Sequence, residues 1–154
     1  MPSIEAAQGN DFFGVQSYSR TRVGAKGVTG PEPGVEVLPM GYEYWPTAAE
    51  ASIRHAAEFL DIPLYVTENG IGTDDDEKRK LYLHDSLTGI ARTIDDGIDV
   101  RGFFQWSLLD NFEWAFGYQM RFGLVEVDRV TQKRTMKPSA YWLSEIIRSQ
   151  QLPN

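Results

Sequence analysis

Apolar residues recur along the chain at two spacings, and these predict alternating strands and helices. Runs rich in β-branched and aromatic residues are typical of strands, whereas apolar residues three and four positions apart are typical of helices. The expected strands are 11–19, 64–68, 100–106 and 121–127, and the expected helices are 47–60, about 74–96 and 138–147. This β-α-β-α-β-(hairpin)-α order predicts an α/β fold with neighbouring parallel strands.

Local signals indicate where the first two helices begin and end. Thr47 and Glu50 have capping-box spacing, in which threonine caps the helix and glutamate reaches back to it. The acidic run 74–77 suits the first turn of the next helix, where the helix dipole favours negative charge, and lacks metal-loop spacing. Gly97 is the expected C-terminal cap. The residues expected to face inward are Ala49, Ile53, Ala56, Ala57 and Leu60, then Leu83, Leu87, Ile90, Ala91 and Ile94.

Two stretches are expected to lack regular structure. The segment 20–46 is rich in glycine and proline and predicts a long loop, with a small hairpin at 35–37. Loops of that length in a compact domain are usually functional or disordered. The segment 129–136 predicts a polar turn.

Polar side chains follow two of the expected strands. Glu68 ends the apolar run from Leu64, and an Asn-Gly turn dipeptide follows it. Trp106 ends the next strand, and a stretch of carboxylates, amides and aromatics follows. Active sites in open α/β sheets and in (β/α)8 barrels lie at the carboxyl ends of strands. We therefore predict a site here with Glu68 at its centre, the alternative being a solvated or ion-paired strand-end glutamate.

Composition narrows the classes of partner. The net charge of −7 argues against nucleic acid and anionic membrane surfaces as partners, and the absence of cysteine excludes disulfides and thiolate chemistry. No apolar run approaches a membrane span, and residues 1–5 do not have the pattern of a signal peptide. We expect one domain over residues 1–154 and a cytoplasmic protein.

The polar stretches closely resemble motifs of glycoside hydrolase family 1, the retaining β-glucosidases. The resemblance covers nearly the whole chain, in the family's order and spacing. It is carried by Asp11–Val15, Thr67–Gly70, Trp106–Trp114, Arg121–Asp128 and Lys137–Trp142. It implies that the chain forms roughly the last three β/α units of a (β/α)8 barrel.

The resemblance also implies roles for individual residues. Glu68 matches the catalytic nucleophile, and Tyr18 matches the tyrosine that contacts it. Gln16 stands where a sugar-facing asparagine is usual, with a longer side chain that leaves its sugar contact open. The remaining matches belong to the sugar pocket: Trp106 under the sugar ring, Glu113 and Trp114 on the sugar hydroxyls, and Phe122 in the wall. The implied substrate is a terminal, non-phosphorylated β-D-glucoside or a small β-linked oligosaccharide.

The family's acid/base glutamate, in a Thr-x-Asn-Glu-Pro stretch, has no counterpart in this sequence. Glu43 and Asp110 are the nearby carboxylates that could replace it. A barrel typically needs about 250 residues, so this chain is about three-eighths of one. Three parallel strands would leave two open edges, which recruit other chains. We therefore expect a homo-oligomer or a complementary barrel fragment as partner.

An alternative from another class is a non-catalytic carbohydrate-binding or assembly fragment. Trp106, Glu113 and Trp114 would then form a sugar platform, and Glu68 would have no catalytic role. The family's mechanism uses carboxylates alone, so no cofactor or metal is expected under either interpretation.

Overall fold

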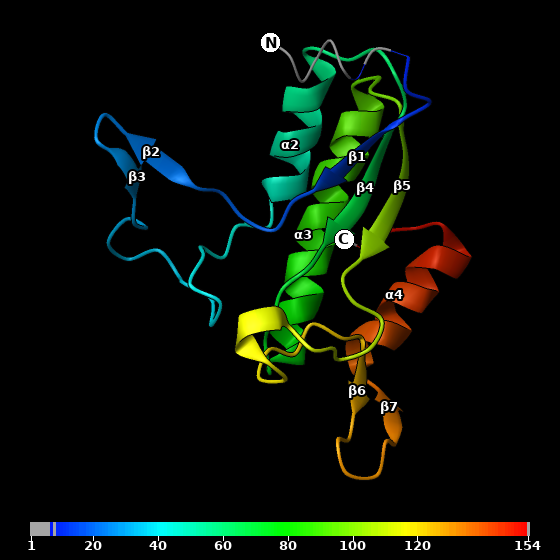
Figure 1. The fold of residues 1–154 in the computed structure, drawn as a ribbon. Coiled ribbons are helices and arrows are strands. Elements are labelled where there is room, and N and C mark those ends of the chain that lie inside the picture. The colour runs from blue at the N-terminus through cyan, green and yellow to red at the C-terminus, as the bar shows by residue number, and fades with distance from the viewer. Residues whose placement is uncertain (1–6, 8, 154) are drawn as a thin grey trace.

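The computed structural model describes residues 7 and 9–153, so the expectation about residues 1–5 lies outside the described range. Its centre is a three-stranded parallel sheet in the order β1-β4-β5 (Figure 1). The strands are β1 (Phe13–Gln16), β4 (Leu64–Asn69) and β5 (Val100–Gln105). The α/β class is therefore confirmed, and the described residues do not form a closed barrel. Strand β1 is shorter than the predicted 11–19, because its pairing with β4 covers only Phe13–Gln16.

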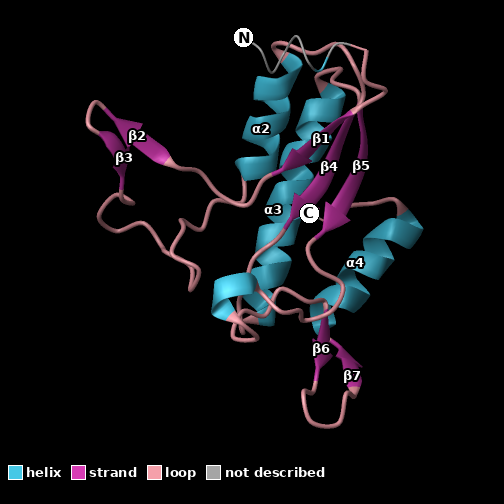
Figure 2. Cartoon of the chain, viewed as in Figure 1, coloured by secondary structure: helices cyan, strands magenta, loops and turns pink. Residues whose placement is uncertain are grey.

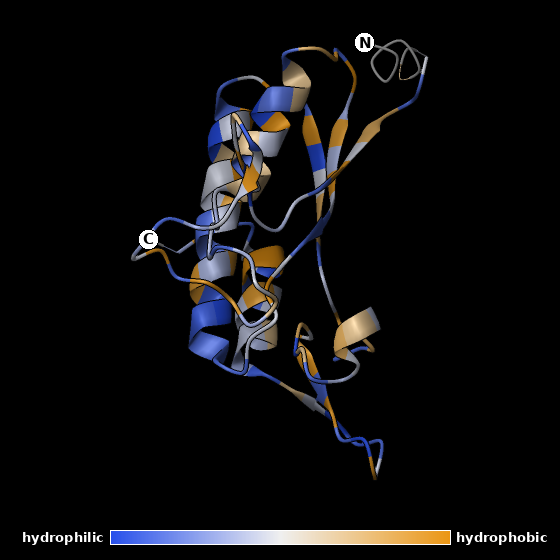
Figure 3. Cartoon of the chain, turned by 60° about the vertical axis from the view of Figure 1, so that its left-hand side comes forward, coloured by the Kyte–Doolittle hydropathy of each residue, from blue (hydrophilic) through white to orange (hydrophobic). Residues whose placement is uncertain are grey.

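Helices α2 (Ala48–Ala57) and α3 (Asp76–Asp95) pack on one side of the sheet (Figures 1 and 3). Their contact with the strands forms the largest core cluster. It comprises Val15 of β1, Leu64 and Val66 of β4, Ala49 and Ile53 of α2, and Ile90 of α3. Helix α4 (Pro138–Ser149) begins with proline, as predicted, and packs against α3 through a second cluster that includes Leu83 and Leu143.

Two hairpins and a short helical turn lie outside the sheet (Figure 2). Strands β2 (Arg22–Gly24) and β3 (Gly27–Thr29) pair within the predicted loop. Strand β6 (Val125–Val127) lies in the strand predicted at 121–127 and pairs with β7 (Arg134–Met136), which lies in the predicted polar turn. The β2–β3 hairpin was missed, because β3 is exposed along its whole length and carries no buried apolar face. The hairpin before the last helix was predicted, although its exposed second strand, β7, was expected to be a turn. The η1 turn spans Trp114–Phe116.

The hairpin predicted at 35–37 is reduced to one antiparallel bridge. Val37 pairs with Glu43, and the tight turn between them is closed by a hydrogen bond from the Gly41 amide to the Leu38 carbonyl. The segment is too short for a regular strand.

The capping-box prediction for α2 was wrong. Thr47 stands at the N-cap, but its side chain makes no capping hydrogen bond. The Glu50 carboxylate instead accepts hydrogen bonds from Arg54 and from Arg92 of α3. These bonds hold the pKa of Glu50 below its usual value despite partial burial. Two cations thus bind the side chain that would otherwise reach back to the cap.

The inward faces of the helices were predicted correctly only in part. Leu83 and Ile90 of α3 are buried as predicted, but Ala91 and Ile94 are exposed. Gly97 follows the C-cap of α3 and has a positive φ of 89°. Ala91 lines an open hollow of about 630 Å³ beside β5, together with apolar residues that include Leu87, Phe104 and Ile147. The hydrophobic stripe of α3 therefore extends beyond the core that the described residues build.

Strands β1 and β5 form the two edges of the sheet, and each pairs on one side only within residues 7 and 9–153. A second apolar hollow of about 460 Å³ adjoins β1 and is lined by residues that include Phe13, Val15 and Phe59. None of the described helices combines the length and apolarity needed to span a membrane.

Candidate active site

Glu68 lies at the carboxyl end of the central strand, and both of its carboxylate oxygens accept hydrogen bonds from β1 and the loop after it. The Tyr18 hydroxyl donates to Glu68 Oε2 at 2.7 Å, and the Gln16 amide donates to Glu68 Oε1 at 2.9 Å. Gln16 and Tyr18 are two positions apart, a spacing that places side chains on the same side of an extended chain. Glu68 is thus held as a hydrogen-bond acceptor by two neutral donors.

Tyr18 is fixed by apolar contacts as well as by its hydroxyl. Its ring meets the buried Phe122 ring edge-on, with centroids 6.1 Å apart. Burial, followed by the hydrogen bond to Glu68, raises the pKa of the Tyr18 phenol. The phenol therefore stays protonated and remains a donor to the carboxylate.

A cavity of about 690 Å³ lies in front of Glu68 and holds most of the predicted site residues. Of the seven candidates, only Gln16 is not part of its lining. The lining consists of Tyr18, Ser19, Arg20, Thr21, Met40, Tyr42, Glu68, Trp106, Asn111, Phe112, Glu113, Trp114 and Phe122. A cavity of this volume has room for a small sugar-sized ligand.

The loop after β5 supplies the other wall of this cavity. Glu113 is buried, and its Oε2 accepts a hydrogen bond from the Asn111 amide at 2.8 Å. The Asn111 Oδ1 in turn accepts from the Ser107 hydroxyl at 3.2 Å. Trp114 behaves differently, because its side chain is 81% exposed and its φ of 44° is in the left-handed region. A non-glycine residue in that region is often part of a functional site.

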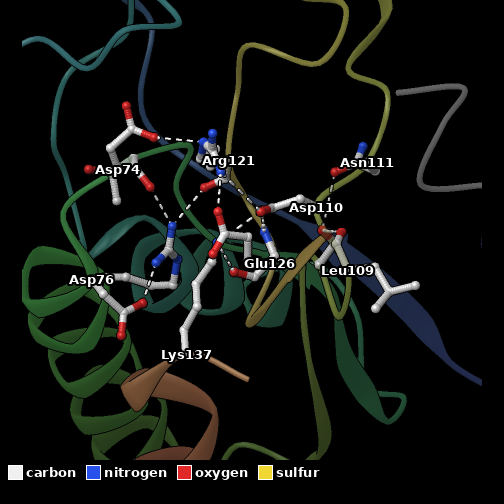
Figure 4. Close-up of polar contacts among 12 residues, drawn as sticks. Asp74, Asp76, Leu109, Asp110, Asn111, Arg121, Glu126 and Lys137 are labelled. Carbon is white, nitrogen blue, oxygen red and sulfur yellow. Dashed lines mark hydrogen bonds and ion pairs between the residues drawn. The ribbon is translucent and has the colours of Figure 1, made fainter. Parts of the chain in front are cut away.

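A buried ion pair anchors the base of this loop. Asp110 Oδ1 accepts hydrogen bonds from Lys137 Nζ at 2.9 Å and from the Gly123 amide at 2.9 Å (Figure 4). Burial, partly offset by Asp110, lowers the pKa of Lys137. Arg121 extends the network on the surface by pairing with Asp74 and Glu126 (Figure 4). The loop that carries Glu113 is thus tied to the start of α4.

A second buried cation joins the loops next to this network. Arg79 is 1% exposed, pairs with Asp76, and donates to the Thr73 carbonyl at 2.5 Å and the Arg121 carbonyl at 2.7 Å. Asp76 also accepts from the Ser139 amide at 2.8 Å, at the start of α4. Within the described residues the acidic run 74–77 forms no metal site. Its carboxylates serve as helix cap and ion-pair partners.

The two carboxylates considered as substitute acids are engaged in structural contacts. Glu43 is 3% exposed and accepts from Arg20 Nε at 2.6 Å, and Asp110 is held by Lys137. Neither residue lines the cavity that contains Glu68. Each is therefore a poor candidate for protonating a leaving group beside Glu68.

Gly70 brings the two walls close together. A Cβ at this position would lie 2.1 Å from the Trp106 carbonyl oxygen, far inside van der Waals contact. The Trp106 amide donates to the Asn69 carbonyl at 2.9 Å at the same point. Only glycine permits the strand ends to approach this closely.

Several cavity residues were not identified from the sequence. Asn111 orients Glu113 but was not among the predicted site residues, and Tyr42 and Arg20 lie in the segment 20–46 that was expected to be a loop. The close spacing of Asp110, Asn111 and Glu113 could have suggested that their side chains form hydrogen bonds with one another. Nothing in the local pattern marks Tyr42.

Comparison with known proteins assigns the chain to a family. The model of the family described as glycosyl hydrolase family 1 matches residues 7–152. The chain belongs to this family. A β-glucosidase from Agrobacterium sp. is 38% identical over 170 residues, covering 95% of this chain and 37% of the relative.

Solved structures of family members superimpose closely on this chain. A crystal structure of the β-glycosidase BGL167 has a TM-score of 0.92 at 48% identity, covering 99% of this chain and 37% of the other. A Thermotoga maritima β-glucosidase in complex with deoxynojirimycin has a TM-score of 0.88 at 35% identity, covering 97% of this chain and 37% of the other. The chain spans about a third of the length of the curated relatives that it matches.

Proposed function

We propose that this family 1 chain carries the nucleophile and part of the sugar pocket of a retaining β-glucosidase. The observation that carries the proposal is the placement of Glu68, whose oxygens accept from Tyr18 and Gln16 at 2.7 and 2.9 Å at the edge of a sugar-sized cavity. The family match and the β-glucosidase relatives support the reaction class.

In the proposed reaction a Glu68 oxygen attacks the anomeric carbon while the bond to the leaving oxygen breaks. Water then hydrolyses the glycosyl-enzyme and releases the sugar with retained configuration. Tyr18 is half-buried, packs edge-on against Phe122 and keeps Oε2 in place throughout. The exposed Gln16 amide on Oε1 is the contact that an incoming sugar can displace.

The sugar pocket is assigned to the loop after β5. Trp106 offers a π face to the sugar ring, and the Glu113 carboxylate offers acceptors to the sugar hydroxyls. The Trp114 indole N–H adds a donor. The hydrogen bond from Asn111 orients the Glu113 carboxylate, so its oxygens face the sugar hydroxyls in one fixed orientation.

The general acid is proposed to come from a complementary part of a barrel. The two open edges at β1 and β5, each beside an apolar hollow, support a partner made of further β/α units. A second copy of this chain is the alternative partner. The close match to one part of longer relatives favours the complementary part.

The test is hydrolysis of 2,4-dinitrophenyl β-D-glucoside, whose leaving group departs without protonation and therefore needs no general acid. We expect the folded chain to release dinitrophenolate, and Glu68→Ala to lower that rate by about a thousandfold or more. Glu126→Ala, which changes an exposed carboxylate outside the cavity, is the matched control. Mass measurement in the same buffer identifies the assembly that acts.

A non-catalytic sugar-binding role is the second candidate, because Trp106, Glu113 and Trp114 all line the cavity of this chain. It predicts no dinitrophenolate release together with quenching of tryptophan fluorescence by deoxynojirimycin. Glu68→Gln distinguishes the two: turnover is lost in the enzyme, and binding is nearly intact in the binding module.

A further inference from the structure

A buried tyrosine of α3 contacts the segment that carries Tyr18. Tyr82 is fully buried, and its hydroxyl donates a hydrogen bond to the Tyr18 carbonyl oxygen at 2.8 Å. The same hydroxyl accepts from the Asn69 amide at 3.1 Å. Asn69 is also fully buried, and its amide donates to the Ser17 carbonyl oxygen at 2.7 Å. Two consecutive carbonyl groups after β1 are thus bound by side chains.

These contacts begin where the regular strand pairing stops. The ladder between β1 and β4 ends at Gln16, and its register shifts between Val15 and Gln16. One further backbone bond, from the Ser17 amide to the Glu68 carbonyl at 3.0 Å, follows the shift. Tyr18 lies beyond this last backbone bond, and the Tyr82 hydroxyl takes the place of a strand partner by donating to the Tyr18 carbonyl.

The four side chains and the Tyr18 backbone form a closed circuit. Glu68 and Asn69 are neighbours on β4, with Glu68 lining the cavity and Asn69 buried. Glu68 binds the Tyr18 phenol from the cavity side, and Asn69 and Tyr82 bind the main chain from the core side. Because two successive peptide carbonyls are held, the direction in which the Tyr18 side chain leaves the backbone is also held.

We propose that Asn69 and Tyr82 are positioning residues, which hold the Tyr18 main chain so that its phenol stays on Glu68. The proposal rests on the function proposed above only for its kinetic consequence. The hydrogen-bond geometry that it describes exists whether or not the chain turns over substrate. Burial raises the pKa of Tyr82, which keeps the hydroxyl protonated as a donor.

The chain offers a matched pair of variants. Tyr82→Phe removes the hydroxyl and keeps the ring, so the packing around α3 is retained. Tyr44→Phe removes the hydroxyl of a ring that packs edge-on against Tyr82 with centroids 5.7 Å apart. The Tyr44 hydroxyl makes no hydrogen bond among the described residues and Tyr44 is outside the cavity lining. Comparing the two variants separates the effect of losing the Tyr82 hydrogen bond from the effect of disturbing the packing of the Tyr44 and Tyr82 rings.

The first measurement is the ¹³C resonance of Tyr18 Cζ in tyrosine-labelled protein, which responds to hydrogen bonding of the phenol. Glu68→Ala supplies the reference shift for the broken bond. We expect Tyr82→Phe to move the Tyr18 resonance most of the way to that reference, and Tyr44→Phe to leave it in place. An unchanged Tyr18 resonance in folded Tyr82→Phe would overturn the proposal. If Tyr82→Phe does not fold, Asn69→Ala is judged by the same criterion.

The second measurement separates kcat from KM in the dinitrophenyl glucoside assay. We expect Tyr82→Phe to lower kcat about tenfold and to change KM less than twofold, because the sugar-facing loop after β5 is untouched. Tyr44→Phe should change neither. Equal changes in both variants would contradict a positioning role. If the wild-type chain has no turnover, the proposed function fails, and the resonance of Tyr18 still decides this inference.

Discussion

Glu68 and Trp114 line the same cavity, yet the segments that carry them are held by different interactions. Glu68 lies at the carboxyl end of the central strand of a sheet, and its carboxylate accepts hydrogen bonds from two neutral donors, Tyr18 and Gln16. Trp114 stands on an exposed turn whose loop is anchored at its base by the Asp110–Lys137 ion pair. The proposed chemical step therefore lies on rigid backbone, and the proposed sugar recognition lies on a loop.

The proposed reacting group therefore stands on a strand of the sheet, and the proposed recognition surface stands on a loop held by an ion pair. The parallel pairing of the strands depends little on salt or pH, because its hydrogen bonds join neutral backbone groups. An ion pair between a loop and a helix depends on pH, although burial limits its screening by salt. Substitutions on the two walls should therefore differ in size and in their dependence on conditions.

The largest expected effect is at the base of the loop after β5. Asp110→Ala leaves the mostly buried Lys137 ammonium without its carboxylate and removes the acceptor of the Gly123 amide. We expect the free energy of unfolding, from urea denaturation at pH 7, to fall by about 3–5 kcal/mol. Glu126→Ala, at the exposed pair with Arg121, should cost less than about 1 kcal/mol. Equal losses in the two variants would show that the loop is held by other contacts.

The junction between the two walls comes next. Gly70→Ala places a methyl group 2.1 Å from the Trp106 carbonyl, so the strand ends must separate. We expect a loss of about 3 kcal/mol in the free energy of unfolding and weaker binding of deoxynojirimycin. Gly30→Ala is the control, because no atom lies within 4 Å of the place that its Cβ would take and its φ is not positive. A Gly70→Ala chain as stable as Gly30→Ala would refute the close approach.

A smaller, pH-dependent effect is expected at Asp76. Although burial acts to raise it, hydrogen bonds from Ser139 and Arg79 hold the Asp76 pKa below its usual 3.8. A depressed carboxyl pKa contributes stability above the unfolded value, and this is lost as pH falls toward the folded value. Asp76→Asn should therefore cost about 2 kcal/mol at pH 7, and its deficit should shrink below pH 3.8.

Asp74→Asn is the matched control for that titration. Asp74 is 84% exposed, and among the described residues its ion-pair partner is Arg121, so its replacement should change the unfolding free energy by less than about 0.5 kcal/mol at any pH. A deficit in Asp76→Asn that stays constant down to about pH 2 would indicate lost packing rather than lost charge.

The smallest stability effect is expected at Trp114. Its ring is mostly exposed, so Trp114→Ala should barely change the unfolding free energy. Trp114→Gly should be more stable than Trp114→Ala by about 1 kcal/mol, because glycine accepts a φ of 44° freely. Both variants should weaken deoxynojirimycin binding, measured by calorimetry, because both lack the indole. Binding that survives in both would remove Trp114 from the sugar pocket.

The sequence predicted the long elements well and the short ones poorly. β4, α3 and α4 follow from continuous apolar patterns and from Pro138 at the first turn. The β2–β3 hairpin was missed because Val23 and Val28, which pair across it, are both exposed and give no burial pattern. Ala91 and Ile94 continue a hydrophobic stripe that the described residues leave uncovered.

In the candidate site, too, some features could be predicted from the local sequence and others could not. The place of Glu68 near the carboxyl end of a strand could be predicted from the apolar run before it, whereas the turn predicted at Asn69 was wrong, because Asn69 is the buried last residue of β4. The approach of Tyr82 and Asn69 to the chain around Tyr18 joins segments 64 and 52 residues apart in sequence. Glu50 was assigned to a cap because Arg92, its partner from another helix, cannot be inferred locally. Short-range patterns record secondary structure, whereas hydrogen bonds between distant segments form only when packing brings those segments together.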